Sequence, residues 1–325
     1  MKQFTVGKNE AGQRFDKLLM KRLNKAPKSF IYKMLRKKNI TLNGKKADGS
    51  ERTELNDVVT FYLSEETIRN FSEFNDTTIV EKVFKIIYED SNILVVNKPA
   101  GLLSQKAAPE DVSLNEHILS YLLSSGQITG EELKTFRPAV CNRLDRNTSG
   151  MVVAGKTLTG LQTMSGLFRD RTLQKYYLCI VKGRVKEAGG ISGYISKNER
   201  TNQVTVTRDF KEGREPIRTE YRPVRYNEQF TLLRVKLITG KTHQIRAHLS
   251  SIGHPIIGDP KYGDKNINTE FRNRYRLEHQ LLHSWQIIFP VMEGEFEVLS
   301  EKELNAELPG YFKEIQDDLF REQMK

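Results

Sequence analysis

Most of the chain after residue 83 reads as short β-strands with few helices between them. The strand-like runs are rich in Val, Ile, Tyr and Phe and span residues 84–90, 93–98, 174–183, 203–210, 218–227, 230–240, 283–290 and 294–300. Helical spacing is confined to 112–126, 157–170 and 243–253, and Pro309 is placed to open a last helix. A doubly wound sheet needs a helix between successive strands, so this order predicts an α+β fold. We expect a mixed, largely antiparallel central sheet with flanking helices.

Residues 1–64 read as a separate small α/β domain. Apolar side chains in its first third recur at helical spacing, and a second helix is expected from Ser29, a suitable N-cap residue. An Asn43-Gly44 pair then follows a short strand, and this dipeptide is the strongest short-range signal for a hairpin turn.

The net charge of +11 is unevenly distributed along the chain. Residues 1–64 hold 15 Lys and Arg against 6 Asp and Glu, whereas residues 65–82 hold 2 against 5. A concentrated positive charge favours a polyanionic partner, and nucleic acid is the commonest one. The acidic stretch has little periodicity and is predicted to be a linker. Residues 83–325, including the C-terminal helix, then form the second domain.

Several classes of protein are disfavoured by composition. No stretch is apolar over the length of a membrane span, and the N-terminus lacks the apolar core of a signal peptide. The two cysteines, Cys141 and Cys179, suit a reducing compartment better than a disulfide framework. The expected location is therefore the cytoplasm, without membrane association.

The N-terminal pattern resembles the S4 RNA-binding domain. Two basic helices precede short strands joined by the Asn-Gly turn, in the order "RFDKLL…KSFIYKMLRKKNITLNGKKA…LNDVVTFY". The resemblance implies that RNA phosphates lie along a set of five cations, Lys33, Arg36, Lys37, Lys45 and Lys46. The alternative is a solvated helix face without a ligand.

Four later stretches place polar, turn-forming residues beside an apolar strand or helix, at 88–102, 142–156, 175–183 and 239–263. Scaffolds commonly present functional side chains on such loops. In the second stretch, Asp145 lies between Arg143 and Arg146. This arrangement is either a surface ion pair or a carboxylate kept ionised for chemistry.

The four stretches, in this order, resemble the RluA-type pseudouridine synthase family. The family's H-R-L-D-x-x-T-S-G motif reads from Asn142 to Gly150 here, with Asn in place of His. Its T-G-R-T-H-Q-x-R-V-H motif reads from Thr239 to His248, and its K-x-Y strand keeps Lys175 and Tyr177.

The resemblance implies that uridines in RNA are isomerised to pseudouridine without a metal or organic cofactor. It assigns catalysis to Asp145, Tyr177 and Arg246, with Arg246 holding the carboxylate ionised. Substrate contacts fall on four further residues: Asn142, Arg143, Arg146 and Thr148. The resemblance also implies that the target nucleotide is flipped out of its stack, and that Arg143 occupies the vacated space or holds the flipped nucleotide.

The resemblance favours 23S ribosomal RNA, or a large-subunit precursor, as the partner, and no protein partner is required. Two alternatives stay open, a tRNA-directed synthase and a non-catalytic RNA-binding factor for ribosome assembly. A metal-dependent hydrolase is disfavoured because paired carboxylates and metal-ligand spacings are missing from the sequence. His243, His248 and His283 are interpreted as structural hydrogen-bonding residues.

Overall fold

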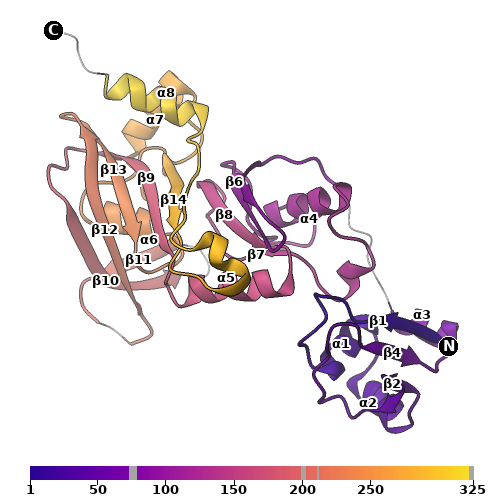
Figure 1. The fold of residues 1–325 in the computed structure, drawn as a ribbon. Coiled ribbons are helices and arrows are strands. Elements are labelled where there is room, and N and C mark those ends of the chain that lie inside the picture. The colour runs from indigo at the N-terminus through magenta and orange to yellow at the C-terminus, as the bar shows by residue number, and fades with distance from the viewer. Residues whose placement is uncertain (73–78, 199–202, 211, 322–325) are drawn as a thin grey trace.

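The computed structural model describes residues 1–72, 79–198, 203–210 and 212–321. These residues form two β-sheets with separate hydrophobic cores, a four-stranded sheet near the N-terminus and an eleven-stranded sheet in the remainder (Figure 1). Helices flank both sheets, and the predicted α+β class is confirmed. Within the described ranges, no helix is long and apolar enough to cross a bilayer.

The N-terminal sheet has the strand order β1-β4-β2-β3 and packs against two helices. Asn43 and Gly44 both have positive φ, 51° and 71°, so they form the expected turn between β2 and β3. The second helix begins earlier than predicted because Pro27, with φ fixed at −59°, takes the N-cap position instead of Ser29. The elements are β1 (Lys2–Thr5), α1 (Phe15–Arg22), α2 (Lys28–Arg36), β2 (Ile40–Leu42), β3 (Lys45–Lys46) and β4 (Val58–Phe61).

The segment predicted as an acidic linker begins with a helix, α3 (Glu65–Phe71), which Ser64 caps through its side chain. Phe71 belongs to the N-terminal unit, because its ring lies 4.4 Å from that of Phe30 and its carbonyl accepts a hydrogen bond from Lys25 N. Residues 73–78 of the predicted linker lie outside the described residues. The division into domains stays a prediction.

The large sheet has the order β11-β10-β12-β13-β9-β14-β8-β6-β5, with β15 paired to β14 and β7 to β8. Every pairing given for it is antiparallel except β14 with β8, where His283 and Ser284 lie opposite Ser149 and Gly150. The strands are β5 (Lys85–Glu89), β6 (Ile93–Lys98), β7 (Ala139–Val140), β8 (Ser149–Gly155), β9 (Gln174–Lys182), β10 (Gly189–Asn198), β11 (Gln203–Thr207), β12 (Glu215–Tyr226), β13 (Phe230–Leu237), β14 (Leu282–Ile288) and β15 (Glu303–Asn305).

Two helical segments differ from the sequence prediction. Helix α7 was not expected, because Phe271 is its only buried residue and an apolar period is therefore missing. Residues 294–300 were predicted as a strand, and this was wrong: Phe296 and Leu299 are buried three positions apart, the spacing of a 3₁₀-helix. The helices are α4 (Leu114–Ser124), η1 (Glu132–Lys134), α5 (Leu158–Arg169), α6 (Gln244–Ser251), α7 (Lys265–Tyr275), η2 (Gly294–Leu299) and α8 (Gly310–Leu319).

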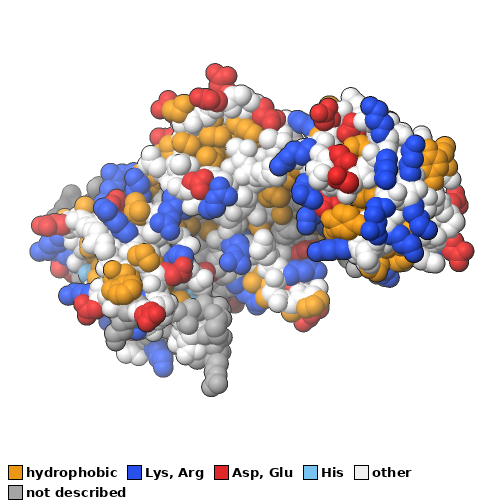
Figure 2. All heavy atoms as spheres, turned by 90° about the horizontal axis from the view of Figure 1, so that it is seen from below, with side chains coloured by type: hydrophobic (Ala, Val, Ile, Leu, Met, Phe, Trp, Pro, Cys, Tyr) orange, Lys and Arg blue, Asp and Glu red, His pale blue; other side chains and the backbone are white. Residues whose placement is uncertain are grey.

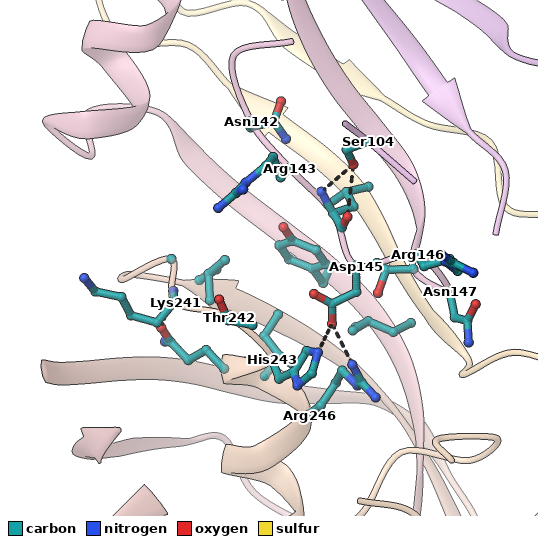
Figure 3. Close-up of a pocket in the computed structure, with 18 of the residues that line it drawn as sticks. Ser104, Asn142, Arg143, Asp145, Arg146, Asn147, Lys241, Thr242, His243 and Arg246 are labelled. Carbon is teal, nitrogen blue, oxygen red and sulfur yellow. Dashed lines mark hydrogen bonds and ion pairs between the residues drawn. The ribbon is translucent and has the colours of Figure 1, made fainter. Parts of the chain in front are cut away.

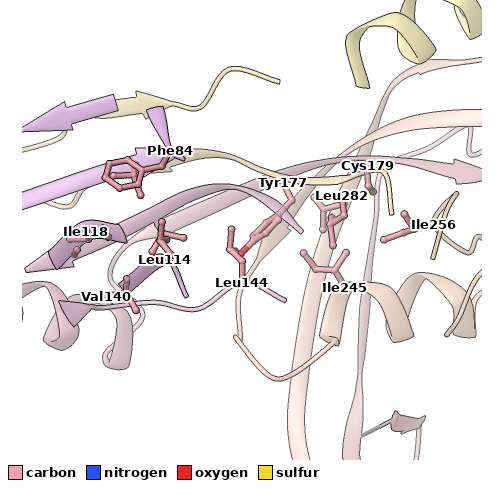
Figure 4. Packing of buried hydrophobic residues seen from close by; sticks show 14 of the residues in the cluster. Phe84, Leu114, Ile118, Val140, Leu144, Tyr177, Cys179, Ile245, Ile256 and Leu282 are labelled. Atoms are coloured by element: carbon pink, nitrogen blue, oxygen red, sulfur yellow. The ribbon is translucent and has the colours of Figure 1, made fainter. Parts of the chain in front are cut away.

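The main core lies beneath the β7–β8 connection. Leu144, Tyr177, Ile245 and Leu282 pack together there from four different segments (Figure 4). Leu144 is 7% exposed, so it anchors the loop that carries Asp145 directly in the core.

Candidate active site

The loop carrying Asp145 is fixed on both sides by short hydrogen bonds. Before it, Ser104 Oγ accepts from Leu144 N and donates to Leu144 O, both at 3.0 Å. After it, Thr148 N donates to Asp145 O at 3.0 Å, and Thr148 Oγ1 accepts from Gln280 at 3.0 Å. Asp145 is therefore presented from a rigid turn, and Thr148 is buried under that turn.

The same loop is also held by Lys98, a residue that the sequence alone did not indicate. Lys98 is fully buried, and its Nζ donates to the carbonyl oxygens of Pro99, Leu102 and Arg146 at 2.9, 2.7 and 3.1 Å. Burial lowers the pKa of Lys98 to about 7, while the charge of Asp145 acts to raise it. Lys98 thus ties the 99–102 turn to the loop that carries Asp145.

Arg246 connects two carboxylates that lie far apart in the sequence. Its Nη1 donates to Asp145 Oδ2 at 2.8 Å, as Figure 3 shows. Its Nε and Nη2 donate to both oxygens of Asp259 at 2.7 and 2.9 Å. Burial lowers the pKa of Arg246, but the two aspartates outweigh it and the net shift is upward. The guanidinium is therefore charged where it faces the Asp145 carboxylate.

His243 lies next to this pair at the start of α6, in a left-handed conformation with φ 53°. Its Nε2 is 3.9 Å from Asp145 Oδ2, and its Nδ1 is 3.0 Å from Tyr262 Oη. Burial is the largest effect on the imidazole and lowers the pKa of His243 below its usual value. Arg246, rather than His243, therefore supplies the positive charge that faces Asp145.

Tyr177 and Tyr176 face opposite sides of β9, as strand alternation predicts. Tyr177 lines the cavity and is 7% exposed, whereas the Tyr176 ring lies 3.9 Å from the Arg234 guanidinium on the other face. Burial raises the pKa of Tyr177 to about 12. Its hydroxyl is protonated at neutral pH.

The two arginines beside Asp145 point to opposite sides of it, and neither is drawn with a bond to the carboxylate (Figure 3). Both are exposed and line the cavity, which is the location expected for substrate contacts. Asn142 also lines the cavity, but its amide donates to Met151 O at 3.3 Å and accepts from Val153 N at 2.9 Å. Asn142 thus fastens the loop to β8.

These residues surround a cavity of about 1150 Å³. Asp145 is the only acidic residue among the described residues that line it. The same walls carry nine Lys and Arg side chains, namely Lys106, Arg143, Arg146, Arg169, Arg171, Lys175, Lys241, Arg246 and Lys261. Such a cavity favours a polyanion.

His248 and His283 make hydrogen bonds within the fold, in agreement with their interpretation as structural residues. His283 Nδ1 lies 2.8 Å from Ser149 Oγ, and its Nε2 donates to Ala306 O at 3.2 Å. His248 Nδ1 lies 2.8 Å from Thr219 Oγ1. Within the described part of the chain, no group of three His, Cys, Asp or Glu residues is placed to hold a metal ion.

The cations singled out in the N-terminal unit lie outside the cavity. Lys and Arg side chains gather on one face of that unit (Figure 2). All five of the predicted RNA contacts are exposed, on or next to α2 and on β3: Lys33, Arg36, Lys37, Lys45 and Lys46.

A mixed sheet that presents one carboxylate in a cavity rich in Lys and Arg suits an enzyme acting on nucleic acid. Residues 92–251 match the family described as RNA pseudouridylate synthase. The chain belongs to the RNA pseudouridine synthase family, and it is an RNA pseudouridine synthase.

Individual relatives support this membership along nearly the whole chain. "Ribosomal large subunit pseudouridine synthase C" of Pasteurella multocida is 32% identical over 299 residues, covering 89% of this chain and 86% of that protein. The protein of the same name from Vibrio cholerae is 30% identical over 314 residues and covers 93% of each chain. The structure of human RNA Pseudouridylate Synthase Domain Containing 4 has the same fold, with a TM-score of 0.58, 24% identity, and coverage of 72% of this chain and 92% of that chain.

Proposed function

We propose that this enzyme isomerises specific uridines of 23S ribosomal RNA to pseudouridine, with Asp145 as the essential carboxylate. The observation that carries the proposal is the contact of Asp145 with the buried guanidinium of Arg246, in a cavity whose other walls carry Lys and Arg but no second acidic residue among the described residues. The names of the Pasteurella and Vibrio relatives support large-subunit ribosomal RNA as the substrate.

The reaction breaks the N1–C1′ bond of the uridine, turns the uracil, and joins C5 to C1′. N1 takes up a proton and C5 loses one, so the change is redox-neutral and no cofactor enters the proposed mechanism. Asp145 acts either as a nucleophile at C1′ or on the base, or as the base that removes the C2′ proton. Each route needs the anion, which the hydrogen bond from Arg246 favours.

Two pocket residues are assigned to the flipped nucleotide. The Tyr177 ring forms part of the cavity wall and is proposed to stack on the uracil. Arg143 is exposed at the mouth of the cavity and is proposed to fill the space that the nucleotide leaves. Arg146, on the opposite side of Asp145, is placed to meet a phosphate.

The N-terminal unit is proposed to be an S4-like RNA-binding domain over residues 1–64. Its exposed cations on and around α2 and on β3 lie away from the cavity. A second basic surface suits a large folded RNA, because it grips the backbone at a distance from the modified base.

The test treats transcripts of 23S ribosomal RNA and of tRNA with purified enzyme and maps pseudouridine. We expect conversion at defined 23S uridines by the wild type, and full RNA binding without conversion by Asp145→Asn. Asp111→Asn is the matched control, because Asp111 is another loop aspartate that does not line the cavity. Conversion by Asp145→Asn would refute the role of the carboxylate. Conversion of tRNA alone by the wild type would identify a tRNA-directed synthase. RNA binding by the wild type without conversion of any transcript would identify a ribosome-assembly factor.

A further inference from the structure

One largely buried cation in the cavity wall has no carboxylate partner among the described residues. Lys175 lies on β9 and is 8% exposed. Its Nζ is 5.7 Å from the centre of the Phe168 ring and would lie 3.8 Å from a Cβ at Gly240, and both of these residues also line the cavity. The amino group is therefore directed into the same cavity as Asp145.

The other buried cations near the site are satisfied by oxygen atoms. Arg246 contacts two carboxylates and Lys98 contacts three carbonyls. For Lys175, the described residues supply the contact with the Phe168 ring, and no hydrogen bond or ion pair is found among them. Burial, and next the like charge of Arg171, lower the pKa of Lys175. A largely buried ammonium that lacks a counter-charge favours a bound anion, so an anion in this part of the cavity would be stabilised.

Arg171 lines the same wall from the turn after α5. Its side chain is exposed, and its backbone has φ 60°, a conformation unusual for a residue other than glycine. No ion pair is found for it within the described ranges, whereas its neighbour Arg169 is paired with Asp170. Two cations without an ion pair among the described residues thus line the same cavity, near enough for the charge of Arg171 to act on Lys175.

We propose that Lys175 and Arg171 form a phosphate subsite, which binds a phosphodiester next to the target uridine. This inference rests on the proposed function for the identity of the RNA. Lys175 and Tyr177 are two positions apart on one face of β9, so their Cα atoms lie about 7 Å apart. A phosphate at Lys175 is thereby placed within one nucleotide of a base stacked on Tyr177.

The test measures RNA binding by fluorescence anisotropy in the Asp145→Asn background, where no product forms. The probes are a 23S fragment containing a uridine that the wild type modifies, and a uridine dodecamer, which needs no assigned target. We expect Lys175→Met and Arg171→Gln each to weaken binding about ten-fold, the loss typical of one hydrogen bond between charged groups. The slope of log K against log salt should fall by about 0.7 for one lost phosphate contact.

A chemical change in the RNA separates phosphate binding from a general effect on folding. The flanking phosphodiesters of the fragment, and each linkage of the dodecamer in turn, are replaced by neutral methylphosphonate. At one linkage this replacement should weaken binding by the parent about ten-fold and leave Lys175→Met unaffected. Lys313→Met on α8, outside the cavity, is the matched control and should respond to methylphosphonate as the parent does.

Equal sensitivity of the parent and Lys175→Met at every linkage, with equal salt slopes, would overturn the subsite. Lys175→Met keeps a long apolar side chain, which favours a folded protein. Arg171→Gln changes an exposed residue, so its RNA affinity can still be measured if Lys175→Met fails to fold. A phosphate-dependent difference without any pseudouridine formation would support the subsite and reject the proposed function. Conversion of uridine by the wild type, with no phosphate-dependent difference between the parent and Lys175→Met, would support the proposed function and reject the subsite.

Discussion

Arg246 and Asp259 form a two-point ion pair, with Nε and Nη2 of the guanidinium 2.7 and 2.9 Å from the two carboxylate oxygens. The Asp259 side chain has no exposed surface, whereas that of Asp145 is 25% exposed. The same Asp259 carboxylate accepts from Lys261 N and Tyr262 N at 2.8 and 3.1 Å. Asp259 therefore fixes the plane of the guanidinium, and Nη1 is left to aim at Asp145.

Asp259→Asn should disturb both stability and catalysis. An amide cannot neutralise Arg246, and breaking a buried ion pair costs about 3 kcal/mol in the free energy of unfolding. The guanidinium is then free to tilt, and a displacement of about 1 Å at a reacting group lowers the rate roughly 100-fold. Denaturant unfolding and single-turnover conversion of 23S transcript measure the two effects.

The control for this variant is Asp264→Asn. Asp264 caps α7 by accepting from Asn266 N and Ile267 N, and Asn is an equally good N-cap residue. Asp264→Asn should change neither the single-turnover rate nor the free energy of unfolding substantially. Full activity in Asp259→Asn would show that the two-point pair does not position Asp145.

Tyr177 should act through its ring over the physiological pH range. Because burial raises the pKa of Tyr177 to about 12, its hydroxyl stays protonated below about pH 11. Tyr177→Phe should keep RNA affinity, whereas Tyr177→Ala should lose one stacking contact and bind about 10-fold more weakly. Anisotropy gives the affinities, and a rate profile from pH 6 to 10 should show no ionisation that Tyr177→Phe removes. Such an ionisation would place a tyrosinate in the mechanism.

The sequence was sufficient to predict the strand-rich α+β fold and to single out Asp145, Tyr177 and Arg246. Strand alternation separated Tyr177 from Tyr176, and Asn43-Gly44 marked a turn, because both signals depend on local geometry. The structure places Arg246 against Asp145, although 101 positions separate them. Only the family resemblance connected these two residues in advance.

Other parts of the site could not be predicted from local patterns. Lys98 bonds to three backbone carbonyls, and backbone groups leave no signature in residue identity. In the sequence, nothing distinguishes Asp259 from the other acidic residues, and its contact with Arg246 is made only by the fold. The available signal for Lys98 is weak: it is a charged residue at the end of the apolar strand β6, where a lysine is rarely buried unless its amino group is bonded.

Gly150 should not tolerate a side chain. Its φ is 112°, and a Cβ would lie 2.3 Å from Ser284 O, where β8 and β14 run in parallel. Gly150→Ala must move a strand that carries the catalytic loop, so we expect a loss of more than about 3 kcal/mol in unfolding free energy. Gly126→Ala is the matched control: its φ is 69° with no atom within 4 Å of the added Cβ, and it should cost about 1 kcal/mol. Equal losses would mean that backbone conformation alone matters at Gly150.

The stability of the enzyme should fall in mild acid because of two buried histidines. Burial lowers the pKa of both His248 and His283 to about 4, against about 6.5 in an unfolded chain. Between pH 6.5 and 4 the unfolded state therefore binds more protons, so the free energy of unfolding decreases as the pH falls through this range and is level above it. At pH 5 the expected loss is about 2 kcal/mol per histidine.

Substitution by an amide removes this titration while keeping a hydrogen bond. In His283→Gln the amide can still donate to Ala306 O, and in His248→Asn the side-chain oxygen can still accept from Thr219 Oγ1, replacing the bonds that the rings make. Urea unfolding at pH 7 and pH 5 should show each variant losing about 2 kcal/mol less than the wild type on acidification. In the double variant the two reductions in acid sensitivity of the unfolding free energy should add, because the two rings bond to different partners, Ser149 and Thr219. A wild type equally stable at both pH values would mean that these imidazoles accept protons inside the fold, and burial would then not control their charge.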